Sequence, residues 1–148
     1  TRKPTIVVMG DASAEEDYVL GALGWASTKN LPILFIVEDN NLSILTEKKV
    51  RRNWEMDDIA KGLKMDAHNI SDDPLVMEMF LKNYDFSYPM LLNINTTRKY
   101  WHAGAGMDDD YTTRYEKELN SLGEEAKNID EQNKLFIETL WQQQLEKQ

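Results

Sequence analysis

The sequence has no cysteine, only two histidines and no long hydrophobic run among its 148 residues. The absence of cysteine excludes disulfides, thiolate nucleophiles and cysteine-ligated zinc or iron–sulfur sites. Two histidines are too few for a zinc site built from three histidines. We therefore expect any metal ion bound by this chain to be a hard cation with oxygen ligands.

Basic residues are also fewer than acidic ones. The chain has 17 lysines and arginines and 26 aspartates and glutamates, which gives a net charge of −9. Nucleic acids and anionic membranes are bound through clusters of basic residues, so we expect neither as a partner. The longest apolar run, residues 33–37, is far shorter than the roughly 20 residues of a membrane-spanning helix. No basic and apolar leader opens the sequence, so we expect a cytoplasmic location, with an organelle matrix as the alternative.

The overall composition, with 41% hydrophobic and 29% charged residues, is typical of one globular domain. Residues 5–9 and 33–37 are apolar runs without polar alternation, as in strands that are buried on both faces of a sheet. Between them, Ser13 and Glu16 have the spacing of a capping box and predict a helix that ends near Lys29. A strand–helix–strand unit implies parallel strands, so the sequence predicts an α/β fold with a parallel sheet flanked by helices.

The rest of the chain continues this alternation and then becomes helical. The patterns predict a short helix over residues 56–63 and a weak strand or its approach over 63–66. A further helix begins at Asp73-Pro74 and is expected to bury Leu75, Val76, Met79 and Phe80. A strand over 89–94 follows, and then two helical stretches that part near Asn128. We therefore expect residues 1–111 to form the α/β core and residues 112–148 to be a C-terminal helical extension of the same domain.

Polar residues follow both of the first two predicted strands: Gly10-Asp11 after one, and Asp39, Asn40 and Asn41 after the other. The carboxyl ends of neighbouring parallel strands share an edge, so we expect Asp11 and Asn40 to meet there. A carboxylate, an amide oxygen and a carbonyl from the following turn suit Mg²⁺, and the helix that starts near Ser13 suits a phosphate. The alternative, which the spacing leaves open, is that these are only turn residues.

The segment Gly10-Asp11-Ala12-Ser13, followed by Glu38-Asp39-Asn40-Asn41, resembles the thiamine-diphosphate motif, which is a Gly-Asp-Gly and a later Asn-Asn. The chain more narrowly resembles the alpha subunit of thiamine-diphosphate-dependent 2-oxoacid dehydrogenases of the pyruvate, branched-chain and acetoin types. The similarity extends through Leu31-Pro32, residues 62–70, residues 88–92 and Thr97-Arg98 with His102, and so covers nearly the whole chain. It implies part of the thiamine-diphosphate-binding fold, namely the C-terminal part of the diphosphate-binding domain.

The resemblance also implies the residues of a cofactor site. Asp11 and Asn40 would bind Mg²⁺ through their side chains, and Leu42 would bind it through its carbonyl oxygen. The metal ion would hold the diphosphate of thiamine diphosphate, together with the main-chain N–H groups of Ala12 and Ser13.

His102 is similar to the loop histidine that, in this family, contacts the diphosphate and assists the reaction, and this makes it the expected catalytic residue. The alternative is a structural histidine within an aromatic cluster beside Tyr100 and Trp101. Among the departures from the family pattern, Ala12 replaces the second glycine of the motif and Asp39 replaces the first asparagine of its pair.

By this resemblance the chain is expected to be part of an enzyme that decarboxylates a 2-oxoacid. A transketolase-like or other carboligating thiamine enzyme is the first alternative, and a non-catalytic interaction subunit with a degenerate cofactor site is the second. The expected partners are a pyrimidine-binding, beta-type chain with the glutamate that activates the cofactor, and the N-terminal part of the diphosphate-binding half. The resemblance therefore implies a hetero-oligomer.

Overall fold

The computed structural model of the chain describes residues 2–98, 100, 102 and 112–147. The chain divides into two compact units, Thr1–Asp110 and Tyr111–Gln148. That the second unit extends the same domain as the first stays a prediction. No helix in the described part of the chain is both long enough and apolar enough to cross a membrane.

The first unit is built on a four-stranded sheet with the strand order β1-β2-β6-β5. All three neighbouring pairs are parallel, which confirms the predicted α/β fold. The strands are β1 (Thr5–Gly10), β2 (Ile33–Asp39), β5 (Asp66–Ser71) and β6 (Met90–Asn95). Their register places the carboxyl ends of β1, β2 and β6 at one edge, because Gly10 pairs with Glu38 and Asp39 pairs with Asn95.

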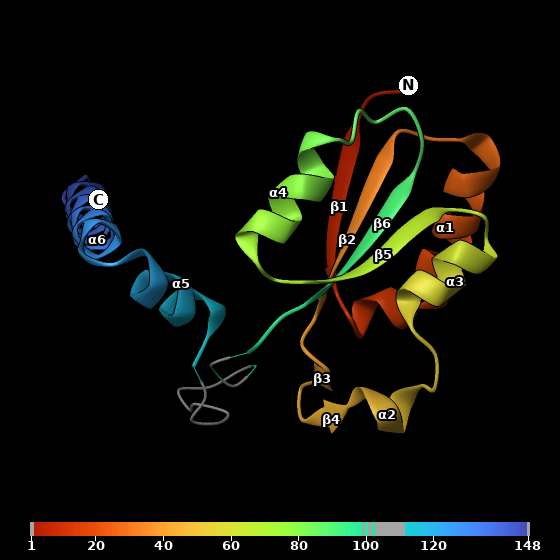
Figure 1. Ribbon diagram of the computed structural model, residues 1–148, viewed down its shortest axis with the longest axis horizontal. Helices are drawn as coiled ribbons and strands as arrows, with labels where there is room; N and C mark the ends of the chain where they lie inside the picture. Colours follow the sequence, from red (N-terminus) through yellow and green to blue (C-terminus); the bar gives the residue numbers. More distant parts are fainter. Residues whose placement is uncertain (1, 99, 101, 103–111, 148) are drawn as a thin grey trace. The chain divides into compact units, whose positions relative to one another are not determined.

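Helices cover both faces of this sheet (Figure 1). The helices α1 (Asp17–Lys29) and α3 (Met56–Gly62) lie on one face, and α4 (Pro74–Lys82) lies on the other. Consecutive residues of β2 alternate between two buried clusters, with Phe35 packed towards α1 and α3, and Leu34 towards α4. The central strands are therefore buried on both faces, as a parallel sheet requires.

The first strand departs from this pattern. β1 is an edge strand, and its side chains Ile6 and Val8 are 56% and 58% exposed. The prediction that residues 5–9 are buried on both faces is thus wrong for the described chain, because nothing in it covers this edge. Val7 and Met9, on the other face, pack only partly against the core.

The start of the first helix also differs from the prediction. Ser13 lies in a short 3-10 turn, η1 (Ser13–Glu15), and α1 begins only at Asp17. Glu16 has an extended backbone and its side chain makes no cap, so the predicted capping box does not form. The buried Ala14 explains the difference, because the turn directs its methyl group into the core.

The predicted start of α4 is correct, since the side chain of Asp73 accepts a hydrogen bond from the Leu75 N–H group at 2.9 Å. Its predicted buried face is only half correct. Val76 and Phe80 pack on the sheet, whereas Leu75 and Met79 are exposed.

The second unit consists of α5 (Arg114–Leu122) and α6 (Glu124–Leu145). The helices part at Gly123 and not near Asn128 as predicted. Gly123 has φ +75° and ψ −155°, a backbone conformation that only glycine adopts readily, so this residue ends α5.

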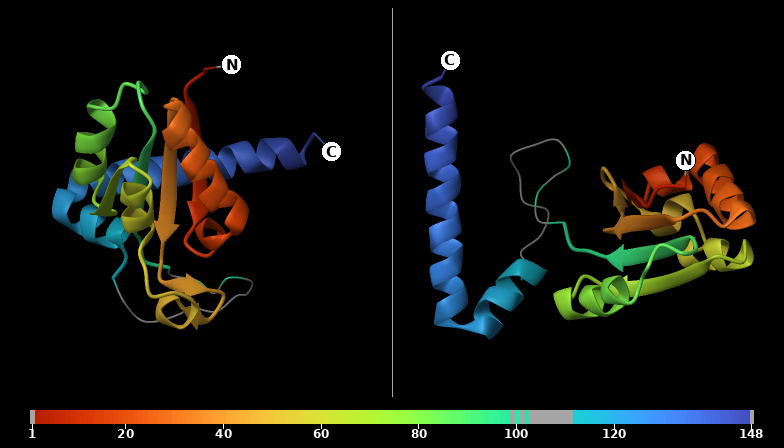
Figure 2. Two further views of the ribbon diagram at one scale, coloured as in Figure 1. Left: turned by 90° about the vertical axis from the view of Figure 1, so that its right-hand side faces the viewer. Right: turned by 90° about the horizontal axis from the view of Figure 1, so that it is seen from above.

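Residues 42–51, to which the sequence patterns assign no element, have structure. A two-stranded hairpin of β3 (Leu42–Ser43) and β4 (Thr46–Glu47) follows β2 and leads into a short helix, α2 (Lys48–Arg51). Figures 1 and 2 show this segment beyond the carboxyl ends of the strands. It therefore returns the chain to the edge where Asp11 lies.

Candidate functional site

The structure brings Asp11 and Asn40 to the same edge of the sheet. The Asp11 N–H group donates to the Glu38 carbonyl oxygen at 3.2 Å, which continues the pairing of β1 with β2 by one residue. Asn40 follows directly after β2, so the two residues occupy adjacent strand ends, as parallel strands predict.

Asp11 is buried, with 2% of the residue exposed, and its carboxylate has a cationic neighbour. Nη2 of Arg51 donates to Asp11 Oδ2, and Nη1 of Arg51 donates to Glu15 Oε1 at 2.6 Å. Arg52 lies behind this pair, where its Nη1 donates to the Asp11 carbonyl oxygen at 3.3 Å. The guanidinium of Arg51 therefore holds the carboxylate that was predicted to bind a metal ion.

Asp39 lies beside this pair and is 3% exposed. Its carboxylate accepts hydrogen bonds from Lys48 Nζ at 2.7 Å, from the Asn41 N–H group at 3.0 Å and from Asn93 Nδ2 at 3.2 Å. Burial by itself would raise the pKa of Asp39, but these donors outweigh it and hold the pKa below its ordinary value. Asp39 is thus ionised at neutral pH.

Lys48 joins Asp39 to a further carboxylate, since its Nζ also donates to Glu55 Oε2 at 2.8 Å. Burial by itself would lower the pKa of Lys48, but the two carboxylates outweigh burial and raise it. The departure of Asp39 from the family's asparagine is therefore compensated within the chain, because the added negative charge has its own ammonium partner.

These residues form one group, which we call the ion-pair cluster. It has one more carboxylate than cations: Asp11, Glu15, Asp39, Glu55, Lys48, Arg51 and Arg52. Several of its buried donors are unused, since Nε of Arg51 and both Nε and Nη2 of Arg52 have no hydrogen-bond partner. The side chain of Arg51 is 13% exposed and that of Arg52 only 1%, so Arg51 is the member that can offer a further donor to an anion at this site.

Asn40 takes part in a local turn. Its Oδ1 accepts the Leu42 N–H group at 3.0 Å, which is the turn role that the sequence left open as an alternative. An amide oxygen has a second lone pair, so this bond does not prevent Asn40 from binding a cation. Leu42 opens β3 and is half-buried.

The roles of the other predicted cofactor ligands, Ala12, Ser13 and His102, stay predictions. Ala12 and Ser13 form the turn after Asp11, where their carbonyl oxygens accept the N–H groups of Glu15 and Glu16. His102 is exposed. Its neighbours 101 and 103–111 lie outside the described residues, and so does the predicted loop that would carry it to the diphosphate.

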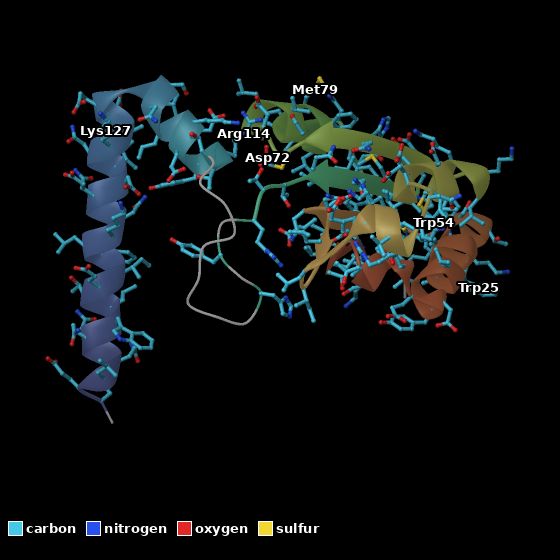
Figure 3. All side chains as sticks on the ribbon, turned by 90° about the horizontal axis from the view of Figure 1, so that it is seen from below. Trp25, Trp54, Asp72, Met79, Arg114 and Lys127 are labelled. Carbon is cyan, nitrogen blue, oxygen red and sulfur yellow. The ribbon has the colours of Figure 1, made fainter. Side chains whose placement is uncertain are left out.

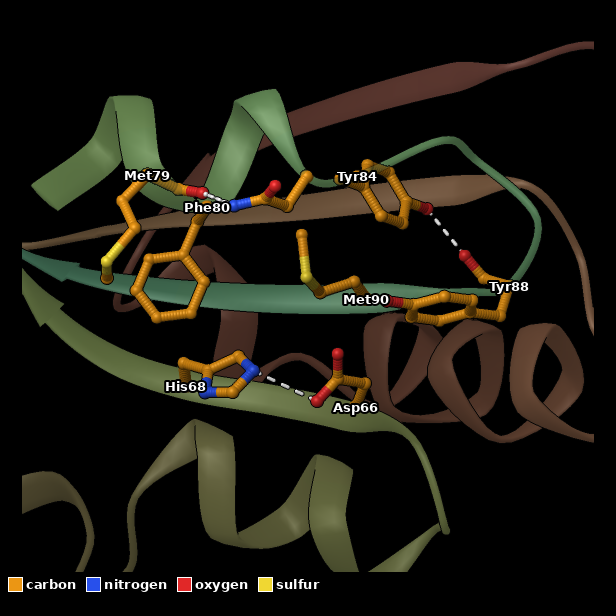
Figure 4. Close-up of a pocket in the computed structure, with 8 residues that line it drawn as sticks. Asp66, His68, Met79, Phe80, Tyr84, Tyr88 and Met90 are labelled. Atoms are coloured by element: carbon orange, nitrogen blue, oxygen red, sulfur yellow. Dashed lines mark hydrogen bonds and ion pairs between the residues drawn. The ribbon is translucent and has the colours of Figure 1, made fainter.

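Away from the ion-pair cluster, a cavity of about 230 Å³ lies between α4 and the sheet, at the amino ends of β5 and β6 (Figure 4). His68 Nε2 lies 2.9 Å from Asp66 Oδ1, and its ring packs on Phe80 with centroids 4.6 Å apart. Burial raises the pKa of Tyr84 to about 12, with Tyr88 and two nearby aspartates adding to it. These residues lie at the opposite end of the strands from Asp11.

The donor atoms near Asp11 suit Mg²⁺ in their chemistry. Asp11, Asn40 and Leu42 offer a carboxylate, an amide and a carbonyl oxygen, all of which are hard ligands. In the part of the chain that the structure describes, no group of three or more His, Cys, Asp or Glu side chains is placed to hold a metal ion. Because Arg51 holds Oδ2 of Asp11, a metal ion at this carboxylate would have to bind the other oxygen beside the guanidinium or take the place of the guanidinium.

The sequence prediction did not include Arg51, Arg52 and Lys48. A signal was present, because residues 48–52 hold four of the few basic residues of an acidic chain and follow the Asn-Asn pair closely. Placing these residues at Asp11 requires the β3–β4 hairpin, and this hairpin was not expected.

Comparisons with known proteins agree with the fold. The family model described as "Dehydrogenase E1 component" matches residues 1–148. Among solved structures, a transketolase from Campylobacter jejuni superimposes with a TM-score of 0.55 at 17% identity, over 62% of this chain and 15% of its own. A protein from Mycobacterium smegmatis that is assigned as a thiamin diphosphate-dependent enzyme gives 0.51 at 23% identity, over 62% and 17%.

At these identities the similarity concerns the fold alone. The chain spans less than a fifth of the length of either solved structure. A comparison with curated proteins gives no significant match.

Proposed function

Because the chain belongs to the dehydrogenase E1 component family, as its sequence predicted, we propose that it anchors the cofactor diphosphate in a thiamine-diphosphate-dependent 2-oxoacid dehydrogenase. The observation that carries the proposal is the buried carboxylate of Asp11, which lies at the carboxyl end of β1 beside the turn of Asn40. This is the edge of a parallel sheet at which ligands bind.

In this proposal Asp11, Asn40 and Leu42 hold Mg²⁺, and the metal ion holds the diphosphate. The N–H groups of Ala12 and Ser13 and the imidazole of His102 complete the binding of the diphosphate. When bound, thiamine diphosphate supplies the carbanion and the electron sink that decarboxylation of a 2-oxoacid needs. The residues of this chain bind and orient the cofactor, and the burial of Asp11 keeps water from its ligand oxygens.

The uncovered edge strand β1 supports the proposal that this chain has partner chains. The apolar side chains Ile6 and Val8 are exposed on one face of β1. On the other face Val7, Met9 and the exposed Trp25 of α1 (Figure 3) help to line an apolar cavity of about 380 Å³. We place the remaining diphosphate-binding half against this edge, and a pyrimidine-binding chain with the activating glutamate across the cofactor, in a hetero-oligomer.

Two alternatives have an observation in their favour. The similarity in fold to a transketolase favours a carboligating thiamine enzyme. The guanidinium of Arg51 on Asp11 favours a non-catalytic subunit whose site has lost its metal ion.

Calorimetric titration of the whole protein, with its partner chains, separates the three functions. Thiamine diphosphate should bind in the presence of Mg²⁺ and not in the presence of a chelator, and the loaded protein should release CO₂ from a 2-oxoacid with an artificial electron acceptor. Cofactor binding with transfer of a ketol group instead would establish the carboligating function. Absence of cofactor binding at saturating Mg²⁺ would establish the non-catalytic one.

A further inference from the structure

The helix that carries Arg51 is held mainly by charge. α2 has only four residues and none of them is buried. Lys48 and Arg51 belong to the ion-pair cluster, whereas Lys49 and Val50 are exposed. A buried ion pair is costly to break without a substitute, but its members can exchange partners when a new counter-charge arrives, and no packed apolar core has to open. Arg51 can therefore leave Asp11 without disturbing the sheet.

Arg52 is the fixed member of this pair of arginines. Its side chain is 1% exposed, its guanidinium lies 4.9 Å from the centroid of the Trp54 ring, and its Nη1 holds the Asp11 carbonyl oxygen. Among the described residues, no aromatic ring supports Arg51 in this way. Of the two cations, Arg51 is thus the one that can move.

A metal ion and Arg51 compete for one carboxylate. A metal ion would have to share the Asp11 carboxylate with the guanidinium that holds its Oδ2, and the two cations repel each other. The ion-pair cluster carries one surplus negative charge, so a divalent cation alone would leave it positive. A diphosphate that arrives with the cation removes this excess of positive charge.

The released guanidinium has a partner in that complex. Arg51 presents planar donors that pair well with phosphate oxygens, and its Nε has no hydrogen-bond partner in the structure. Its Nη1 can keep the bond of 2.6 Å to Glu15 as a pivot. The diphosphate would thus replace Asp11 as the acceptor of Arg51.

We propose that Arg51 is a built-in counter-cation of the Asp11 site, which closes the carboxylate to a metal ion alone and becomes a ligand of the diphosphate when metal ion and diphosphate bind together. The proposal rests on the proposed function. It makes metal ion and cofactor bind interdependently, since each lowers the cost of moving Arg51 for the other.

The test uses Mn²⁺ as the metal probe on the whole protein with its partner chains. Binding of Mn²⁺ alone is measured by electron paramagnetic resonance, and binding of thiamine diphosphate at saturating Mn²⁺ by calorimetry. Arg51→Gln should bind Mn²⁺ alone about tenfold more tightly than the wild type and thiamine diphosphate about tenfold more weakly. Lys49→Gln is the matched control, because it removes the same charge from the same helix at a side chain that is 75% exposed.

Arg51→Lys is the second variant, for the case that Arg51→Gln does not fold. It keeps the positive charge, so Mn²⁺ alone should bind as weakly as to the wild type. It loses the planar pair of donors, so the affinity for thiamine diphosphate should still fall. An unchanged cofactor affinity in Arg51→Lys would contradict the proposal.

The outcomes distinguish failure of the proposed function from failure of the role assigned to Arg51. If the wild type binds Mn²⁺ but no thiamine diphosphate, the proposed function is wrong and this inference with it. If the wild type binds the cofactor and Arg51→Gln matches Lys49→Gln in both affinities, the proposed function stands and the role of Arg51 is wrong.

Discussion

At the scale of single residues, the buried charge of Asp39 depends on neighbouring cations and hydrogen-bond donors. A buried carboxylate is costly unless cations and hydrogen-bond donors surround it, and Asp39 has Lys48, Arg52 and Asn93. Asp11 and Asn40 could be paired from the sequence, because two parallel strands fix where their ends lie. The partners of Asp39 could not, since they arrive through a hairpin and through an asparagine in the middle of β6.

Asp39→Asn should lower the free energy of unfolding by about 3 kcal/mol at pH 7, because Lys48 and Arg52 lose a buried partner. The hydrogen bonds keep the pKa of Asp39 below its ordinary value of 3.8, so its contribution is present above that pH and is lost as the pH falls through the folded-state pKa. The difference between variant and wild type should therefore shrink below pH 4. Urea denaturation at several pH values measures it.

Asp58→Asn serves as the control for this effect. Asp58 is exposed and lies 4.0 Å from Lys61, so its replacement should change the free energy of unfolding little at any pH. Equal stability of Asp39→Asn and Asp58→Asn at pH 7 would contradict the assigned role of the Asp39–Lys48 pair.

At the scale of elements, three strands of the four-stranded sheet follow from local pattern, whereas β5 (Asp66–Ser71) meets the predicted segment 63–66 at Asp66 only and the β3–β4 hairpin was not expected. β1, β2 and β6 lie within two residues of their predicted ranges, because apolar runs without polar alternation are a strong strand signal. The boundaries that were wrong depend on information outside the local pattern. The turn at Ser13 follows from burial of Ala14, and the break at Gly123 from a backbone angle.

Gly123→Ala should destabilise the α5–α6 unit by about 1–3 kcal/mol, because alanine is strained at φ +75° and ψ −155°. An added Cβ meets no atom within 4 Å at Gly123 or at Gly62, so steric crowding is the same at both positions. Gly62→Ala, at the end of α3, is the matched control and should be neutral or slightly stabilising.

Amide hydrogen exchange measures both variants in the two units separately. Exchange in α5 and α6 should accelerate in Gly123→Ala and stay as in the wild type in Gly62→Ala. Unchanged exchange in Gly123→Ala would mean that the backbone angle at Gly123 does not decide where the helices part.

At the scale of the whole molecule, the chain exposes more apolar surface than a self-contained domain of its size is expected to show. β1 is bare on one face, and Trp25 is exposed beside the other. In the second unit Phe136, Ile137 and Trp141 of α6 are exposed as well. The apolar pattern of residues 5–9 predicted a buried strand, and only the sheet order identifies β1 as an uncovered edge strand.

Val8→Lys should prevent assembly with the proposed partner chains while leaving the sheet folded, because it places a charge in the centre of the apolar face of β1. Val50→Lys is the control, since Val50 is also an exposed valine (72%, against 58% for Val8) and lies on α2. Sedimentation of the mixed chains should show a smaller species for Val8→Lys only. Complete assembly of Val8→Lys would contradict the assignment of this edge to a partner.

The central claim is that the carboxylate of Asp11 binds the cofactor's metal ion, and one pair of variants tests it directly. Asp11→Asn and Glu15→Gln each remove one negative charge from a partner of Arg51, but only Asp11 is a proposed ligand. Calorimetric titration of the whole protein with thiamine diphosphate and Mg²⁺ should show loss of binding in Asp11→Asn and binding within a few-fold of wild type in Glu15→Gln. Binding at wild-type affinity in Asp11→Asn would contradict the account.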